Sequence, residues 1–234
     1  MSSLSPFQDS IAARLAPHGL HLRGTVRFPQ GEGGPLMDNG RAARSVLLIG
    51  NVGGSIWQAF SDWRASQPDR GGKDPLDRWS KSVIGAIATA AGATAYYPSD
   101  QPYQPFQRWA VMAEGLETSP LGILVHPEYG LWHGYRGALG FADELGEGER
   151  HLSGNHPCDT CRDKPCQTVC PVRAVAAGRF DVAACRRFLG TDPGRDSCMR
   201  KGCQARAACP VGPDYRYPGG QLRFHMEALD LPAC

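Results

Sequence analysis

The stretch HPCDTCRDKPCQTVCPVRAV, residues 156–175, places four thiols within thirteen residues. Eight cysteines form two runs that each end in Cys-Pro: Cys158, Cys161, Cys166 and Cys170, then Cys185, Cys198, Cys203 and Cys209. A segment of about 80 residues buries too little apolar surface to be stable alone and usually needs a metal or covalent links. The cysteines therefore constrain the fold of this region more than any other feature.

Runs of this kind are typical of two-cluster ferredoxins. Four thiolates hold each [4Fe-4S] cluster, and the cysteine of the Cys-Pro pair ligates the other cluster. The proline suits this position because it lacks a backbone N–H and can begin the next helix. The rule predicts one ligand set of Cys158, Cys161, Cys166 and Cys209, and a second of Cys185, Cys198, Cys203 and Cys170. Cys234 is left as a spare thiol.

The spacing also leaves alternatives open. Four residues, RDKP, separate Cys161 from Cys166, whereas bacterial ferredoxins have two at this place. Two zinc sites are one alternative, although zinc folds usually separate two cysteine pairs by a longer loop, and disulfides are another. Residues 158–216 contain eleven Lys and Arg against six Asp and Glu, an excess that would offset the negative charge of two clusters. Clusters are the favoured interpretation.

The cysteines and tryptophans divide the chain. All nine cysteines lie at or after residue 158, and all five tryptophans lie before residue 133. This predicts a cofactor domain over 1–150 that folds without the tail, a polar linker near ADELGEGERHLSGNH, and a small ferredoxin-like domain over 151–234. The net charge of +2 and the lack of a leader or a long apolar run argue against nucleic-acid or membrane partners and favour a cytoplasmic protein.

Helix and strand signals alternate in the first 150 residues. Ser5 and Pro6 begin a predicted helix that ends before Gly19, and Asp74 and Pro75 begin another. The stretches HLRGTVRF, SVLLIG and ATAYYP are predicted strands, and PFQRWAVMAEGL is a predicted helix. LGILVHP and LWHGYRGALGF are predicted as strands joined by the turn EYG. The expected class is α+β.

Residues 119–141 combine aromatic side chains, glycines and Arg136. One interpretation is a wall for a large flat ligand, with Arg136 on its carboxamide or phosphate groups. The alternative is an aromatic hairpin with a structural arginine-carboxylate pair. GNVGGS, residues 50–55, is a weaker candidate for a phosphate-binding turn.

ATAYYP followed by LGILVHPEYGLWHGYRGALGF resembles the core of the cobalamin-processing decyanase and dealkylase family. With the double-cluster tail behind it, the chain is also similar to epoxyqueuosine reductases and reductive dehalogenases. The resemblance implies a nitroreductase-like fold that binds a corrinoid as its cofactor. The residues expected to bind it are His126, Pro127, Tyr129, Gly130, Trp132, Tyr135, Arg136, Gly137 and Tyr97. No catalytic residue can be assigned, because the catalytic acid of the epoxyqueuosine reductases has no counterpart that the sequence identifies.

The function implied is reductive. Two [4Fe-4S] clusters would pass electrons from a flavodoxin, a ferredoxin or a reductase to cobalamin in the first domain, for cobalamin processing or for a corrinoid-dependent reduction of a small molecule. This would make the chain an oxidoreductase. One alternative is a reductase that uses flavin mononucleotide (FMN) on the same fold. The other is a non-catalytic ferredoxin-like electron carrier or corrinoid chaperone.

Overall fold

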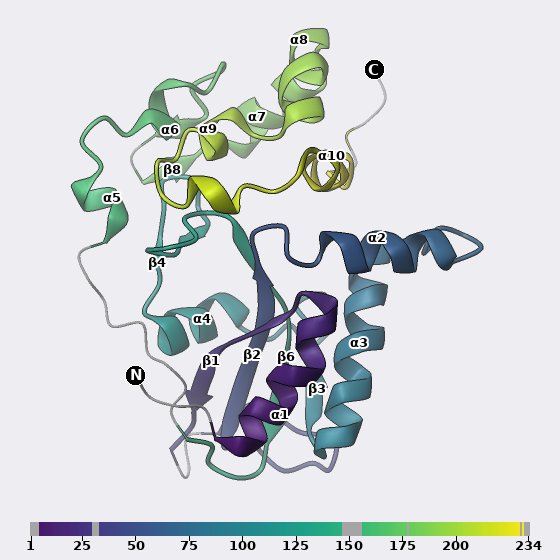
Figure 1. Cartoon of the computed structure of the whole chain (residues 1–234). Helices are drawn as coiled ribbons and strands as arrows, with labels where there is room; N and C mark the ends of the chain where they lie inside the picture. The colour runs from purple at the N-terminus through teal and green to yellow at the C-terminus, as the bar shows by residue number, and fades with distance from the viewer. Residues whose placement is uncertain (1–4, 30–32, 147–155, 177, 230, 232–234) are drawn as a thin grey trace. The chain divides into compact units, whose positions relative to one another are not determined.

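The computed structural model describes residues 5–29, 33–146, 156–176, 178–229 and 231 (Figure 1). These residues form two compact units. The first comprises residues 1–115 and 134–152, and the second comprises residues 116–133 and 153–234. The chain therefore enters the second unit twice.

The first unit contains a four-stranded sheet in the order β1-β2-β6-β3. Its elements are α1 (Pro6–Leu15), η1 (Ala16–His18), β1 (His21–Arg27), β2 (Ser45–Val52), α2 (Trp57–Ser66), α3 (Pro75–Ala91), β3 (Thr94–Tyr96), α4 (Phe106–Glu114) and β6 (His133–Phe141). β1 runs antiparallel to β2, and β3 runs antiparallel to β6. Helices α1 and α3 lie side by side on one face of this sheet (Figure 1). The unit is a mixed α/β structure.

Local sequence signals explain the first helix. Ser5 and Gln8 form a reciprocal capping box, in which the Ser5 side chain accepts from the Gln8 N–H and the Gln8 side chain accepts from the Ser5 N–H. Ile11 and Leu15, one turn apart, are fully buried, whereas Phe7 stays exposed. Helices form where both pairs of signals predict them, as α1 and α3, although the Asp74 side chain makes no cap hydrogen bond to α3.

Residues 121–127 and 131–141 each contribute a strand on either side of the turn, as predicted, but the two strands do not pair with one another. β5 (Leu124–Val125) instead pairs with β4 (Glu117–Thr118) in a separate two-stranded sheet, and β6 joins the four-stranded sheet. A backbone bridge between His126 and Gly130 closes the turn that separates them. The turn was placed correctly, but its two arms belong to different sheets.

The second unit is built of short elements. Besides β4 and β5 they are α5 (Pro157–Thr160), α6 (Pro165–Thr168), β7 (Val175–Ala176), β8 (Arg179–Phe180), α7 (Val182–Leu189), α8 (Asp192–Gly194), the π-helical turn η2 (Arg195–Met199), α9 (Gln204–Ala207), η3 (Pro213–Tyr215) and α10 (Gly219–Glu227). Asp181 caps α7 by accepting from the Ala184 N–H, as its sequence position predicts. Elements of four residues are too short to be stable on their own, so tertiary contacts must hold them.

The boundary near residue 150 and the nitroreductase-like and ferredoxin-like folds stay predictions. The division into units assigns residues 116–133, which include five of the nine expected corrinoid-binding residues, to the cysteine-containing unit. Among the described residues, no helix has both the length and the apolar character needed to cross a bilayer.

Candidate functional site

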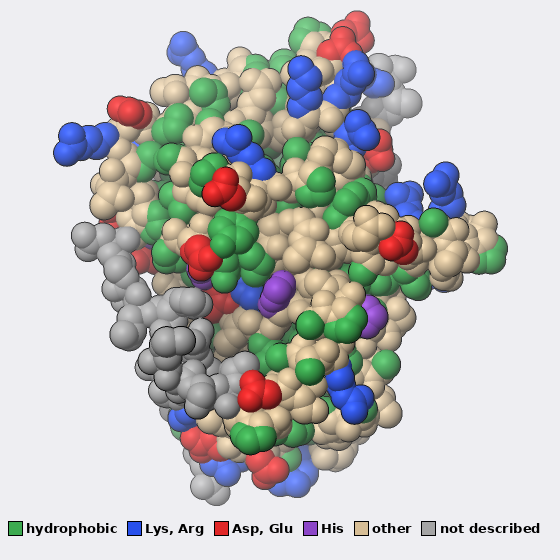
Figure 2. Space-filling view, viewed as in Figure 1, with side chains coloured by type: hydrophobic (Ala, Val, Ile, Leu, Met, Phe, Trp, Pro, Cys, Tyr) green, Lys and Arg blue, Asp and Glu red, His purple; other side chains and the backbone are tan. Residues whose placement is uncertain are grey.

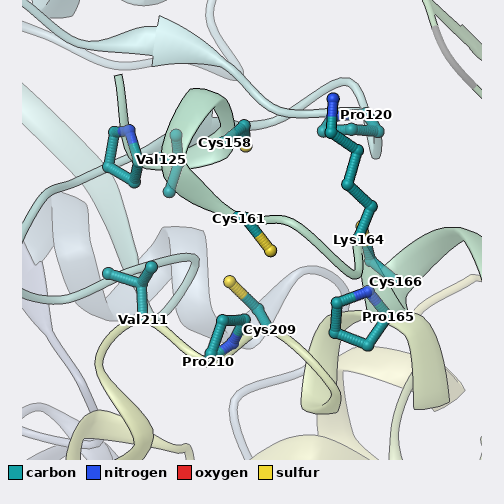
Figure 3. Close-up of a pocket in the computed structure, with 11 residues that line it drawn as sticks. Pro120, Val125, Cys158, Cys161, Lys164, Pro165, Cys166, Cys209, Pro210 and Val211 are labelled. Carbon is teal, nitrogen blue, oxygen red and sulfur yellow. The ribbon is translucent and has the colours of Figure 1, made fainter. Parts of the chain in front are cut away.

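The first group of thiols surrounds a pocket in the second unit (Figure 3). Cys158 lies on α5, Cys161 at its end, Cys166 on α6, and Cys209 after α9. Apart from Lys164, the other lining residues are apolar: Pro120, Val125, Pro157, Pro165, Pro210 and Val211. The thiols of Cys161 and Cys209 point toward one another across this space (Figure 3). Cysteines up to 51 positions apart in the sequence (209 − 158) thus meet in one place.

Burial and mutual repulsion raise the pKa values of two of these thiols, Cys158 and Cys166. Burial is the largest cause for Cys158, and the neighbouring Cys209, Cys166 and Cys161 add to it, so that its pKa rises to about 11. The pKa of Cys166 is raised by burial and then by Cys209 and Cys161. Neutral thiols are therefore favoured here until a positive centre compensates the thiolate charges.

The other four cysteines form a second group. Burial raises the pKa of Cys185 to about 11, with further contributions from Cys203, Cys170 and Cys198. Burial raises the pKa of Cys203. Hydrogen bonds from the backbone N–H groups of Arg206 and Ala205 lower this pKa and offset part of the rise. The cysteines that raise the pKa of Cys158 and of Cys185 thus fall within the two interleaved sets that the Cys-Pro rule assigns. Their role as ligands stays a prediction.

Donors to sulfur are present in both groups. The Ala174 N–H donates to Cys170 Sγ at 3.4 Å, and Gln204 Nε2 donates to Cys198 Sγ at 3.7 Å. The Val211 backbone N–H lowers the pKa of Cys209, although burial raises it overall. Such donors stabilise thiolates and tune iron-sulfur clusters. Among the described residues, no three or more His, Cys, Asp or Glu side chains are grouped closely enough to hold a single metal ion.

Residues 116–133 supply much of the apolar packing around both thiol groups. One buried cluster joins Leu121, Val125 and Leu131 from this segment to Val175 and Ala205. The cysteines packed against the cluster are Cys158, Cys166, Cys170, Cys203 and Cys209. This segment therefore supports the cysteine sites directly.

Arg206 joins the same segment to α9. Its guanidinium carbon lies 4.4 Å from the centre of the Trp132 ring and 4.6 Å from that of Tyr217, and its Nε donates to the Leu131 carbonyl at 3.1 Å. A cation held between two aromatic faces and bonded to a carbonyl fixes both segments. Sequence reasoning missed Arg206, because two of its partners, Leu131 and Trp132, lie about 75 positions earlier in the chain.

Five of the expected corrinoid-binding residues lie in the second unit. His126 is buried, with its ring stacked 4.0 Å from that of Tyr129 and its Nδ1 accepting from the Glu128 and Tyr129 N–H groups. Gly130 has a φ of 58°, and a Cβ there would lie 2.1 Å from the Val211 carbonyl oxygen. Pro127 is exposed, and Trp132 is almost fully buried. Most of these side chains therefore serve the packing of the turn in this structure.

The other four lie in the first unit. Arg136 Nη1 is 3.6 Å from Asp77 Oδ1, and its Nε donates to the Tyr135 carbonyl. A Cβ at Gly137 would lie 2.8 Å from Ile84 Cδ1, so a larger residue there would require the Ile84 side chain on α3 to shift. The Tyr97 hydroxyl donates to the Lys81 carbonyl at 3.3 Å. Arg136 thus forms a structural pair with a carboxylate, as the alternative to ligand binding predicts. Its partner, Asp77, lies on α3 and not across a hairpin.

Tyr135 lies beside an ion pair that sequence reasoning also missed. Arg23 makes two hydrogen bonds to Glu114, of 2.9 and 2.8 Å, and both residues are about 95% buried. The Arg23 guanidinium lies 5.2 Å from the Tyr135 ring centre, while burial and then Glu114 raise the pKa of Tyr135. In the glycine-rich turn at 50–55, the Ser55 hydroxyl donates to the Gly19 carbonyl at 2.6 Å, and phosphate binding there stays a prediction.

The comparisons with known proteins give similarity to solved structures alone. No family model matches the chain, and no curated protein matches it. Among solved structures, the chain is similar to a crystal structure of a C. elegans B12-trafficking protein CblC, described as a human MMACHC homologue. The alignment covers 94% of this chain and 91% of that chain, at 14% sequence identity and a TM-score of 0.46. Values this low assign neither a fold nor a function to the chain.

Proposed function

We propose that this chain is an iron-sulfur redox protein whose two [4Fe-4S] clusters pass electrons to a corrinoid held by the first unit. The observation that carries the proposal is the grouping of eight thiols into two interleaved sets of four. Each set takes one cysteine from the other run, so the two clusters would be held by the same chain segments. This arrangement favours electron transfer from one cluster to the other.

The donor set fits clusters better than zinc. Zinc requires four sulfurs about 2.3 Å from one ion. A [4Fe-4S] cluster takes each thiolate at a separate iron, and therefore suits thiols that surround a pocket, as in the first group. Backbone and amide donors on Cys170, Cys198 and Cys209 match the hydrogen bonding that clusters need.

Purified anaerobically, the protein should be brown and contain about eight iron and eight sulfide per chain. Cys166→Ser or Cys203→Ser should lower this content, because each removes one ligand from one set. Cys234→Ser, at a position outside the described residues, is the matched control and should leave it unchanged. Zinc in place of iron, with no visible absorption, would refute the proposal.

The corrinoid as acceptor is supported by the motif resemblance over residues 93–98 and 121–141. When bound, the corrinoid would supply a cobalt centre able to accept electrons at low potential. Tyr97, Tyr135, Arg136 and Gly137 are the residues of the first unit proposed to border it. The clusters reach potentials low enough to supply such electrons.

Protein reduced photochemically and freed of excess reductant should transfer about two electrons per chain to added hydroxocobalamin, one from each cluster. Visible spectroscopy under anaerobic conditions measures this transfer. The matched control is Cys166→Ser combined with Cys203→Ser, which should transfer almost none. Transfer to FMN with no response to any corrinoid would favour the flavin alternative. Binding of cobalamin without its reduction would favour the carrier or chaperone.

A further inference from the structure

The turn that follows Cys170 lies at the surface of the second unit. Pro171, Val172 and Arg173 are all exposed, and Val169 on the other side of Cys170 is 40% exposed. The turn is tight: the Arg173 N–H donates to the Cys170 carbonyl at 3.0 Å, and the Ala174 N–H donates to its sulfur. The thiol of Cys170 is thus separated from solvent by little more than its own turn.

Strand register brings α7 beside this turn. Val175 pairs with Phe180, and the Asp181 N–H donates to the Ala174 carbonyl at 2.8 Å. Arg173 and Val182 adjoin these two hydrogen-bonded residues in the sequence, outside the strands. Arg186 follows Val182 by one helical turn and therefore lies on the same side of α7. The exposed residues of this region define the Cys170 face: Val169, Val172, Arg173, Val182 and Arg186.

The Cys170 face is basic, whereas the segment bearing the first three cysteines is not. Residues 169–187 contain four arginines and one aspartate. Residues 158–168 contain Arg162 and Lys164 against Asp159 and Asp163. Figure 2 shows several lysine and arginine side chains, with acidic side chains beside them, over the part of the surface near α8. Positive charge is thus concentrated beside the second thiol group.

We infer that the Cys170 face docks a small electron-donor protein with an acidic surface, and that electrons enter at the second thiol group. The inference rests on the proposed function. Three exposed valines between arginines provide a small apolar contact with a charged border, as expected for a brief redox encounter. Opposite charges steer such partners together and set their orientation. In each transfer the donor loses one electron, the second centre gains it, and no bond is made or broken.

Arg173→Glu in the full chain tests the inference. With reduced flavodoxin as an acidic probe, the second-order rate of reduction at low ionic strength should fall about tenfold, because a repulsive charge replaces an attractive one. The difference should disappear at about 0.5 M salt, where the Debye length is only a few ångströms. Stopped-flow absorbance measures both rates, and photoreduced deazaflavin, which is small and uncharged, should reduce both proteins equally.

Arg162→Glu is the matched control. It reverses an exposed charge beside the first thiol group and should change the flavodoxin rate less than twofold. Arg173→Gly removes the cation where a φ of 50° suits glycine, so its expected slowing by about threefold cannot come from strain. Equal slowing by Arg162→Glu, or wild-type rates for both Arg173 variants, would overturn the docking face alone. Protein without iron would overturn the proposed function as well.

Discussion

Cys170→Ser should empty the site of Cys185, Cys198 and Cys203 and leave the site of Cys158 filled, although Cys170 is only four positions from Cys166. The reason is that Cys170 lies with the second group of thiols in space. Iron should fall from about eight to about four atoms per chain, and one of two cluster signals should vanish from the electron paramagnetic resonance spectrum of the reduced protein.

Cys209→Ser should give the opposite result, because Cys209 lines the pocket of Cys158, Cys161 and Cys166. The signal that survives identifies the site. Cys170→Ser and Cys185→Ser should both keep only the signal of the first site. Cys209→Ser and Cys158→Ser should both keep only the signal of the second site. If Cys170→Ser matched Cys158→Ser instead, each run of four cysteines would hold its own cluster, and the interleaved arrangement would be wrong.

A chain that ends at residue 150 should misfold, contrary to the expectation from the tryptophan and cysteine distribution. It would retain residues 116–133 but lose the remainder of the second unit, against which Leu121, Val125, Leu131 and Trp132 pack. Exposing four such side chains costs about 1.5–3 kcal/mol each, or about 6–12 kcal/mol together. Residues 116–133 would then have no surface on which to fold, and their exposed apolar side chains would favour aggregation.

The matched control removes residues 116–133 as well and joins residue 115 to residue 134 by a short glycine-serine linker. This chain keeps the four strands of the larger sheet and should unfold cooperatively on heating. Thermal unfolding followed by circular dichroism, with the soluble yield of each protein, makes the comparison. A cooperative transition in the chain of residues 1–150 would show that residues 116–133 do not need residues 153–234 in order to fold.

Part of this arrangement is encoded in local sequence. The capping box at Ser5, the proline of α3 and the Asp181 cap specify helix starts through contacts within three or four residues, and all three helices form where expected. The two ligand sets follow from the Cys-Pro spacing, a local pattern with a known structural meaning, and they stay a prediction.

Contacts between distant segments were decided only by the tertiary structure. The placement of Trp132 against Arg206 and the ion pair of Arg23 with Glu114 join residues whose sequence separation carries no periodic signal. Local hydrophobic pattern reports that a residue is buried, but not which surface buries it. For this reason the sequence identified residues 119–141 as unusual, whereas only the fold divided them between the cysteine-containing unit and the sheet.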